Sequence, residues 1–209
     1  MTNERAGAIA LIAGTIAMIG VMALHPEGVH AGPGAQPVLR LGLIVHGVAI
    51  AATPLLTFGF FALSRHIGFD RPLAALAFFF FAFGAIAVML AAAMSGLVAT
   101  RLIEGGANHD LLRLEWYLNQ AFATIHVAMF SAAFVLYALA WPHKGALGAA
   151  LQVAGFAIGL GVLAWLFSGT LTLNVHGMGA VMLAHGLWII LAAFAMLLSG
   201  TRDAQRGGI

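Results

Sequence analysis

The chain has 209 residues, of which 62% are hydrophobic and only 8% are charged. Soluble domains carry about 25% charged residues, so this composition excludes an ordinary soluble protein and indicates membrane-spanning helices. Cysteine is absent, which excludes disulfides, thiolate metal sites and cysteine nucleophiles. The formal net charge is +2 and the basic residues form no stripe, so nucleic-acid binding is not expected.

Six stretches are long and apolar enough to cross a bilayer, since a spanning helix needs about 20 mostly apolar residues. In chain order they are expected at about 6–24, 41–63, 73–100, 114–141, 146–168 and 174–199. The predicted fold class is therefore all-α, a polytopic membrane protein with six transmembrane helices in three consecutive helical hairpins. The whole chain, residues 1–209, is expected to form a single integral membrane domain.

The loop charges predict the orientation. With the N-terminus inside, the inner segments carry six Lys and Arg residues and the outer loops carry three. We therefore expect a multi-pass protein of the inner (cytoplasmic) membrane with both termini in the cytoplasm. An alternative is that the first span is a cleaved secretory signal ending near Val29-His30-Ala31, which leaves five spans and the same C-terminal orientation.

Histidine recurs in the second, fourth and sixth spans at a similar distance from a basic residue at the inner side. The offsets are 19, 18 and 17 residues, for His46 to Arg65, His126 to Lys144 and His185 to Arg202. Because a helix rises 1.5 Å per residue, these offsets predict three imidazoles at similar depth in the outer half of the bilayer.

Each of these histidines also shares a helix face with other polar or methionine side chains. The three faces are His46, Thr53, Thr57 and Ser64; Glu115, Asn119, His126 and Tyr137; and Asn174, Met178, His185 and Met196. Polar faces of spanning helices usually point to the bundle interior or to a water-filled cavity. We therefore expect the three imidazoles to converge, although a buried histidine bonded to a neighbouring carbonyl is the simpler interpretation of each one alone.

Converging imidazoles suit a transition metal such as zinc, iron or copper, and a facing pair suits haem b. The first functional hypothesis is therefore redox or metal-dependent chemistry at His46, His126 and His185. Thr53, Glu115, Asn119 and Asn174 are expected to support these ligands or to line a path to them. The outer mouth holds three further candidate ligands, His25, His30 and His176.

Two other classes of function fit the same pattern. The first is a transporter of a small solute, metal ion or protons, with the polar faces of the second, fourth and sixth spans lining the path and Pro54 acting as a hinge. The second is a non-catalytic assembly subunit that joins partner membrane subunits within the lipid bilayer. Whether the protein is an enzyme is left open. Gly155 and Gly159 form a GxxxG pattern, which we interpret as helix packing.

Overall fold

The computed structural model describes residues 3–26, 35–142 and 145–206, and these residues contain no strand. The helices are α1 (Asn3–Leu24), α2 (Ala35–Ile67), α3 (Pro72–Ala93), the π-helix η1 (Met94–Val98), α4 (Ala99–Glu104), α5 (His109–Ala140), α6 (Gly145–Phe167) and α7 (Val175–Arg206). Because α3, η1 and α4 follow one another without a gap, the described residues form six helices long and apolar enough to cross a membrane. The prediction of an all-α polytopic membrane protein is confirmed. His30 and Lys144 lie outside the described residues.

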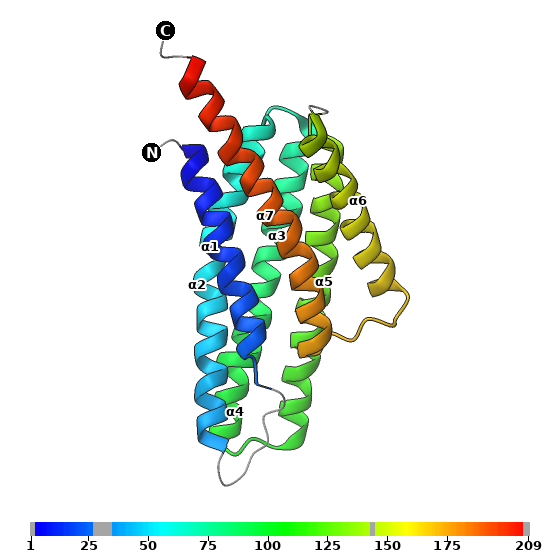
Figure 1. Ribbon diagram of the computed structural model, residues 1–209. Coiled ribbons are helices and arrows are strands. Elements are labelled where there is room, and N and C mark those ends of the chain that lie inside the picture. The colour runs from blue at the N-terminus through cyan, green and yellow to red at the C-terminus, as the bar shows by residue number, and fades with distance from the viewer. Residues whose placement is uncertain (1–2, 27–34, 143–144, 207–209) are drawn as a thin grey trace.

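Helices that follow one another along the chain pack side by side, and α1 also contacts α7. The predicted hairpin pairs α1–α2, α3–α5 and α6–α7 are all in contact, and further contacts of α5 with α6 and of α1 with α7 join them. Both termini lie at the same end of the bundle, at the top of Figure 1. We call this the terminal end, and the opposite end, where α4 lies, the vestibule end.

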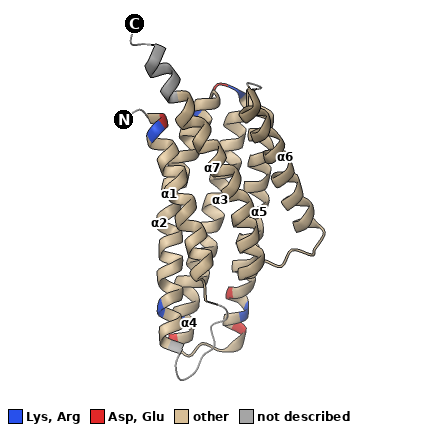
Figure 2. Ribbon diagram, in the orientation of Figure 1, with Lys and Arg blue, Asp and Glu red and all other residues tan. Residues whose placement is uncertain are grey.

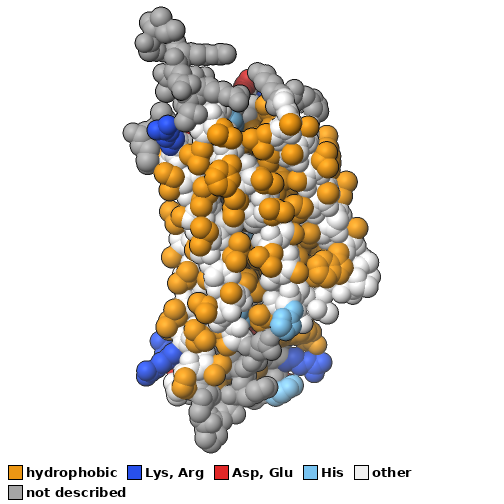
Figure 3. Space-filling view, viewed as in Figure 1, with side chains coloured by type: hydrophobic (Ala, Val, Ile, Leu, Met, Phe, Trp, Pro, Cys, Tyr) orange, Lys and Arg blue, Asp and Glu red, His pale blue; other side chains and the backbone are white. Residues whose placement is uncertain are grey.

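The distribution of charged and hydrophobic side chains on the surface is the one that a membrane-spanning protein needs. Lys, Arg, Asp and Glu gather at the two ends of the bundle (Figure 2), and hydrophobic side chains cover the face between them (Figure 3). Many large apolar residues on the outside are about half exposed or more, including Phe83 at 63% and Val153 at 68%. Such a continuous apolar surface is stable only against lipid, so this chain is a multi-pass membrane protein.

The helices differ in length, and this difference shapes the vestibule end. Helices α2 and α5 have 33 and 32 residues, whereas α1 and α6 have 22 and 23. At 1.5 Å per residue the long pair measures about 50 Å and the short pair about 33 Å. The hydrocarbon core is about 30 Å thick, so the long helices extend beyond it. They extend past α1 and α7 at the vestibule end (Figure 1).

Buried aromatic residues fill the bundle toward the terminal end. The rings of Phe60 and Phe81 stack with centroids 3.9 Å apart, and Phe134 stacks on Trp188 at 4.7 Å. All four side chains have 0% exposure. With Phe130 and Tyr137 they form what we call the aromatic cluster, which packs closely in this half of the bundle.

The GxxxG pattern of α6 packs this helix closely against α5. A Cβ at Gly159 would lie 2.6 Å from the Ser131 carbonyl oxygen, and one at Gly155 would lie 2.9 Å from the Ala138 Cβ. Both distances are too short for a real side chain, so the backbones approach only because glycine stands there. The structural interpretation of this pattern is confirmed.

The helices begin at residues whose side chains favour a helix start, and these residues can be recognised in the sequence. Pro72 occupies the first turn of α3, where its missing N–H costs nothing. The side chain of Asn108 caps α5 by accepting a hydrogen bond from the Leu111 N–H at 3.0 Å. Gly106, just before this cap, has φ +67°, a conformation that glycine adopts without strain.

Candidate functional site

A cavity of about 480 Å³ opens at the vestibule end of the bundle. Its walls come from α1, α2, α3, η1, α4, α5 and α7, so almost every span contributes to it. Much of the lining is small, with Gly42, Ala49, Ala91, Ala92, Ser95, Ala99 and Ala123 facing the space. The cavity therefore exists because the long helices carry small residues here, whereas aromatic rings fill the other half of the bundle.

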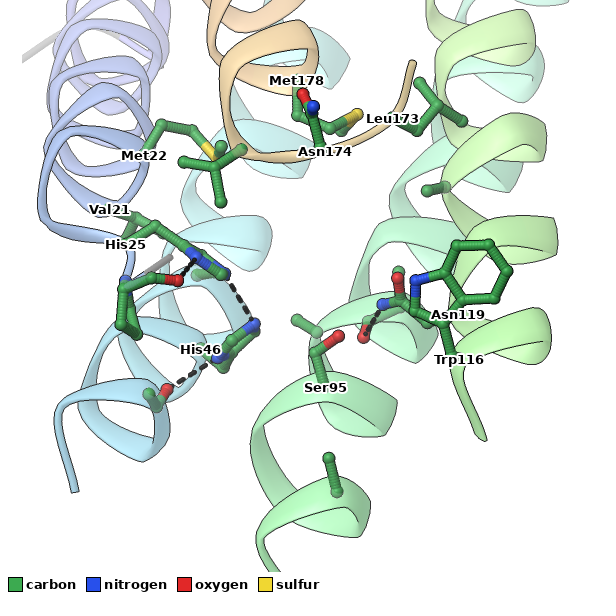
Figure 4. Close-up of a pocket in the computed structure, with 18 of the residues that line it drawn as sticks. Val21, Met22, His25, His46, Ser95, Trp116, Asn119, Leu173, Asn174 and Met178 are labelled. Atoms are coloured by element: carbon green, nitrogen blue, oxygen red, sulfur yellow. Dashed lines mark hydrogen bonds between the residues drawn. The ribbon is translucent and has the colours of Figure 1, made fainter. Parts of the chain in front are cut away.

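Two histidines, one just after α1 and one within α2, face each other on one wall of this cavity (Figure 4). His25 follows directly after the end of α1, and His46 lies about three turns inside α2. Their Nε2 atoms are 3.2 Å apart, and the rings meet edge to face at 78°. His46 is buried, with 8% exposure, whereas His25 is partly exposed. We call these two residues the His25–His46 pair.

The other ring nitrogens define the tautomers of the pair. Nδ1 of His46 lies 2.6 Å from the Gly42 carbonyl oxygen, and Nδ1 of His25 lies 3.0 Å from the Pro26 carbonyl oxygen. A carbonyl only accepts, so both Nδ1 atoms carry the proton and donate it. In neutral imidazoles both Nε2 atoms then present lone pairs to each other. Two acceptors at 3.2 Å repel unless a cation, either a proton or a metal ion, lies between them.

Gly96 in the π-helix η1 makes room for this arrangement. A Cβ at Gly96 would collide with the Cβ of His46, and it would lie 2.8 Å from Cγ of the same ring. π-Helical turns inside α-helices occur often at functional sites, because the extra residue re-aims the neighbouring backbone. Gly96 could not be singled out from the sequence, because Met94-Ser95-Gly96 is an ordinary stretch for a membrane helix.

The opposite wall carries polar groups from α5. The Asn119 side-chain amide donates to the Ala91 carbonyl oxygen at 2.9 Å, and the Gln120 amide donates to the Leu173 carbonyl oxygen at 3.4 Å. Glu115 is 9% exposed, and its Oε1 has no hydrogen-bond partner among the described residues. A buried carboxylate oxygen without a partner is costly, so this group is available to a bound cation or a polar ligand.

Two predicted site residues on the last span have different surroundings. The Asn174 side-chain oxygen accepts a hydrogen bond from the Gly177 N–H at 2.9 Å, so this residue caps α7 at the edge of the cavity. A Cβ at Gly177 would collide with the Thr172 carbonyl oxygen, which makes the tight entry into α7 specific to glycine. His176 is exposed on the first turn of α7, and the cavity lining next to it comes from Val175 and Met178.

His126 and His185 lie deeper in the bundle, around a second and much smaller cavity of about 20 Å³. Nδ1 of His126 donates to the Gly84 carbonyl oxygen at 3.1 Å, and Nε2 of His185 lies 3.1 Å from the Ser131 hydroxyl. The two imidazoles are 0% and 1% exposed. Thr53 lines the same cavity, and its hydroxyl donates to the Ala49 carbonyl oxygen at 2.9 Å.

The structure thus divides the predicted ligands between two places. His46, Thr53, His126 and His185 are all buried, which confirms that their helix faces point inward. His46 pairs with His25 at the large cavity, whereas His126 and His185 share the small one. Within residues 3–26, 35–142 and 145–206, no three His, Asp or Glu side chains are grouped as a metal site.

No protein-family model, curated protein or solved structure matches the chain. The function is therefore inferred from the geometry of the two cavities alone.

Proposed function

We propose that this protein is a membrane metalloprotein that binds one transition-metal ion between His25 and His46 and receives a small, largely apolar organic molecule in the adjoining cavity. The observation that carries this function is the facing pair of Nε2 lone pairs, 3.2 Å apart, with both tautomers held by carbonyl groups. Such a pair needs a cation between its members, and the cavity beside it is far larger than an ion requires.

The distance within the pair suits a metal ion. Two imidazoles that bind one ion at about 2.05 Å with a tetrahedral angle place their nitrogens about 3.3 Å apart. Metal-binding histidines usually donate the other ring N–H to a carbonyl or carboxylate, as His25 and His46 do here. Two axial ligands of a haem iron lie about 4 Å apart on opposite faces of the ring, so the pair favours a bare metal ion over haem b.

The surroundings of the pair favour a borderline transition metal such as zinc, iron or copper, the ions that imidazole binds well. Two protein ligands leave further coordination positions, which face the cavity. The Glu115 side chain lines the same cavity and brings negative charge, which offsets part of the cost of holding a divalent ion near lipid. His46 thus keeps the role expected from the sequence, and His25 takes the place foreseen for His126 and His185.

The position of the cavity favours a binding or catalytic site over a transport pathway across the membrane. It opens at the vestibule end, and the aromatic cluster fills the bundle on its other side. Pro54, the proposed hinge of a transporter, lies within the uninterrupted helix α2. By the loop charges, both termini face the cytoplasm of the inner membrane, so the cavity opens on the outer side.

The test is metal analysis and an absorption spectrum of the detergent-purified, full-length protein loaded with Zn²⁺ or Cu²⁺. We expect about one ion per chain, no Soret band, and loss of the ion in both His25→Ala and His46→Ala. His109→Ala is the matched control, because His109 is an exposed histidine at the same end of the bundle. Retention of the ion in both pair variants, or no binding by the folded wild type, would refute the proposed metal site.

A further inference from the structure

The small cavity carries a second inference that is independent of the metal site. It is lined by Thr15 of α1, His126 of α5 and His185 of α7, together with apolar side chains such as Leu56, Phe81 and Ile189. Thr15 Oγ1, His126 Nε2 and His185 Nδ1 are buried and have no hydrogen-bond partner among the described residues. Three such polar atoms from three helices around one cavity are unusual, because buried polar groups nearly always have partners.

We infer that this cavity binds a single water molecule that bridges Thr15, His126 and His185. The volume of about 20 Å³ is enough for a water molecule, for which a cavity of about 10–15 Å³ suffices, and is too small for an organic molecule. A buried water typically makes about three hydrogen bonds, and three polar atoms are present here.

The chemistry of the three atoms matches one water. His126 donates through Nδ1 to the Gly84 carbonyl, so its Nε2 is an acceptor that a water O–H reaches. The Thr15 hydroxyl can rotate, so it either donates a hydrogen bond to the water oxygen or accepts one from a water O–H. His185 contacts the Ser131 hydroxyl through Nε2, and its Nδ1 faces the water as donor or acceptor according to that contact. Every polar atom of the cavity is then satisfied.

A neutral ligand is favoured over a cation at this site. No carboxylate of the described residues lines the small cavity, and the two imidazoles are almost completely buried among apolar groups. Moving an ion into such surroundings without an opposite charge is strongly unfavourable, even after the protein relaxes around it. The His25–His46 pair differs in this respect, because Glu115 lines the same cavity.

Whether the small cavity holds a water can be tested by the direction in which the melting temperature changes in one variant. If a water bridges these groups, Thr15→Val removes one of its partners, and the melting temperature of the full-length protein in detergent falls by about 2–4 °C. If the cavity is dry, the same change replaces an unsatisfied hydroxyl by a methyl group, and the melting temperature stays the same or rises. Thr124→Val is the matched control, because the exposed Thr124 hydroxyl bonds only to its own helix, at the Gln120 carbonyl oxygen.

A high-resolution crystal structure of the wild-type protein provides a second test that does not depend on a variant. We expect one density peak within hydrogen-bond distance of at least two of the three atoms, without anomalous scattering at the zinc, copper or iron edge. An empty cavity would overturn the inference. An anomalous peak would also overturn it and would identify a buried metal ion instead.

Discussion

Replacing Gly96 by alanine is the sharpest way to disturb the His25–His46 pair without removing a ligand. The new Cβ would lie 2.8 Å from Cγ of His46, whereas carbon atoms rest at about 3.5–4.0 Å. The imidazole must therefore retreat by about 1 Å. Metal–ligand distances tolerate deviations of about 0.2 Å, so the displaced Nε2 no longer binds at full strength. We expect metal affinity to fall about 10–100-fold, the range typical of lost support around a metal ligand.

This loss corresponds to about 1.4–2.8 kcal/mol and is measured by titrating Zn²⁺ against a chromophoric chelator in detergent solution. Gly47→Ala is the matched control: Gly47 is next to His46 on the same helix, and a Cβ there meets nothing within 4 Å. We expect this variant to bind as the wild type does. Circular dichroism establishes that both variants keep their helices. An unchanged affinity in Gly96→Ala, or an equal loss in Gly47→Ala, would show that the packing of η1 on His46 does not control the site.

Three further predictions concern stability, each followed by thermal unfolding in detergent. Asn174→Ala removes the cap that binds the Gly177 N–H and should cost about 1 kcal/mol, whereas Asn174→Ser keeps a capping oxygen and should recover most of it. Trp188→Phe keeps a buried ring but removes the donor to the Leu151 carbonyl, and should cost about 1–3 kcal/mol; no loss would mean that this carbonyl finds another partner. Phe60→Ala opens a void in the aromatic cluster and should cost about 3–5 kcal/mol while metal affinity is retained; a smaller cost would indicate that the neighbouring rings collapse into the space.

The spans were predictable from the sequence because each one is a local property. The expected second span, 41–63, lies inside α2, and the expected fifth span, 146–168, coincides with α6 to within one residue at each end. A helix in lipid satisfies its own backbone groups, so hydropathy and length suffice to locate it. The same local chemistry explains the ends of α3 and α5, where Pro72 and Asn108 stand.

The grouping of the histidines was not predictable in the same way. Offsets from the basic residues predict equal depth only if these residues lie at one common height, and they do not. Helix α5 ends at Ala140, before Lys144, whereas α7 continues as helix to Arg206, past Arg202. Long basic side chains reach the interface from different depths, so an equal offset in sequence does not ensure an equal height in the bundle. His25 and His46 are 21 residues apart on two antiparallel segments, and no periodicity within one helix relates them.

By itself, the sequence determined that this chain crosses a membrane six times and that its polar helix faces point inward. Both properties are local, because the length of an apolar segment and the helical spacing of its polar residues can be read from that segment alone. Only the tertiary structure decided which inward groups meet. The unequal lengths of the helices, the close approach allowed by Gly96, and the division of the interior between small and aromatic side chains place His46 beside His25 and leave His126 with His185. These contacts depend on how helices pack against one another, and packing is a relation between distant segments that no single stretch of sequence contains.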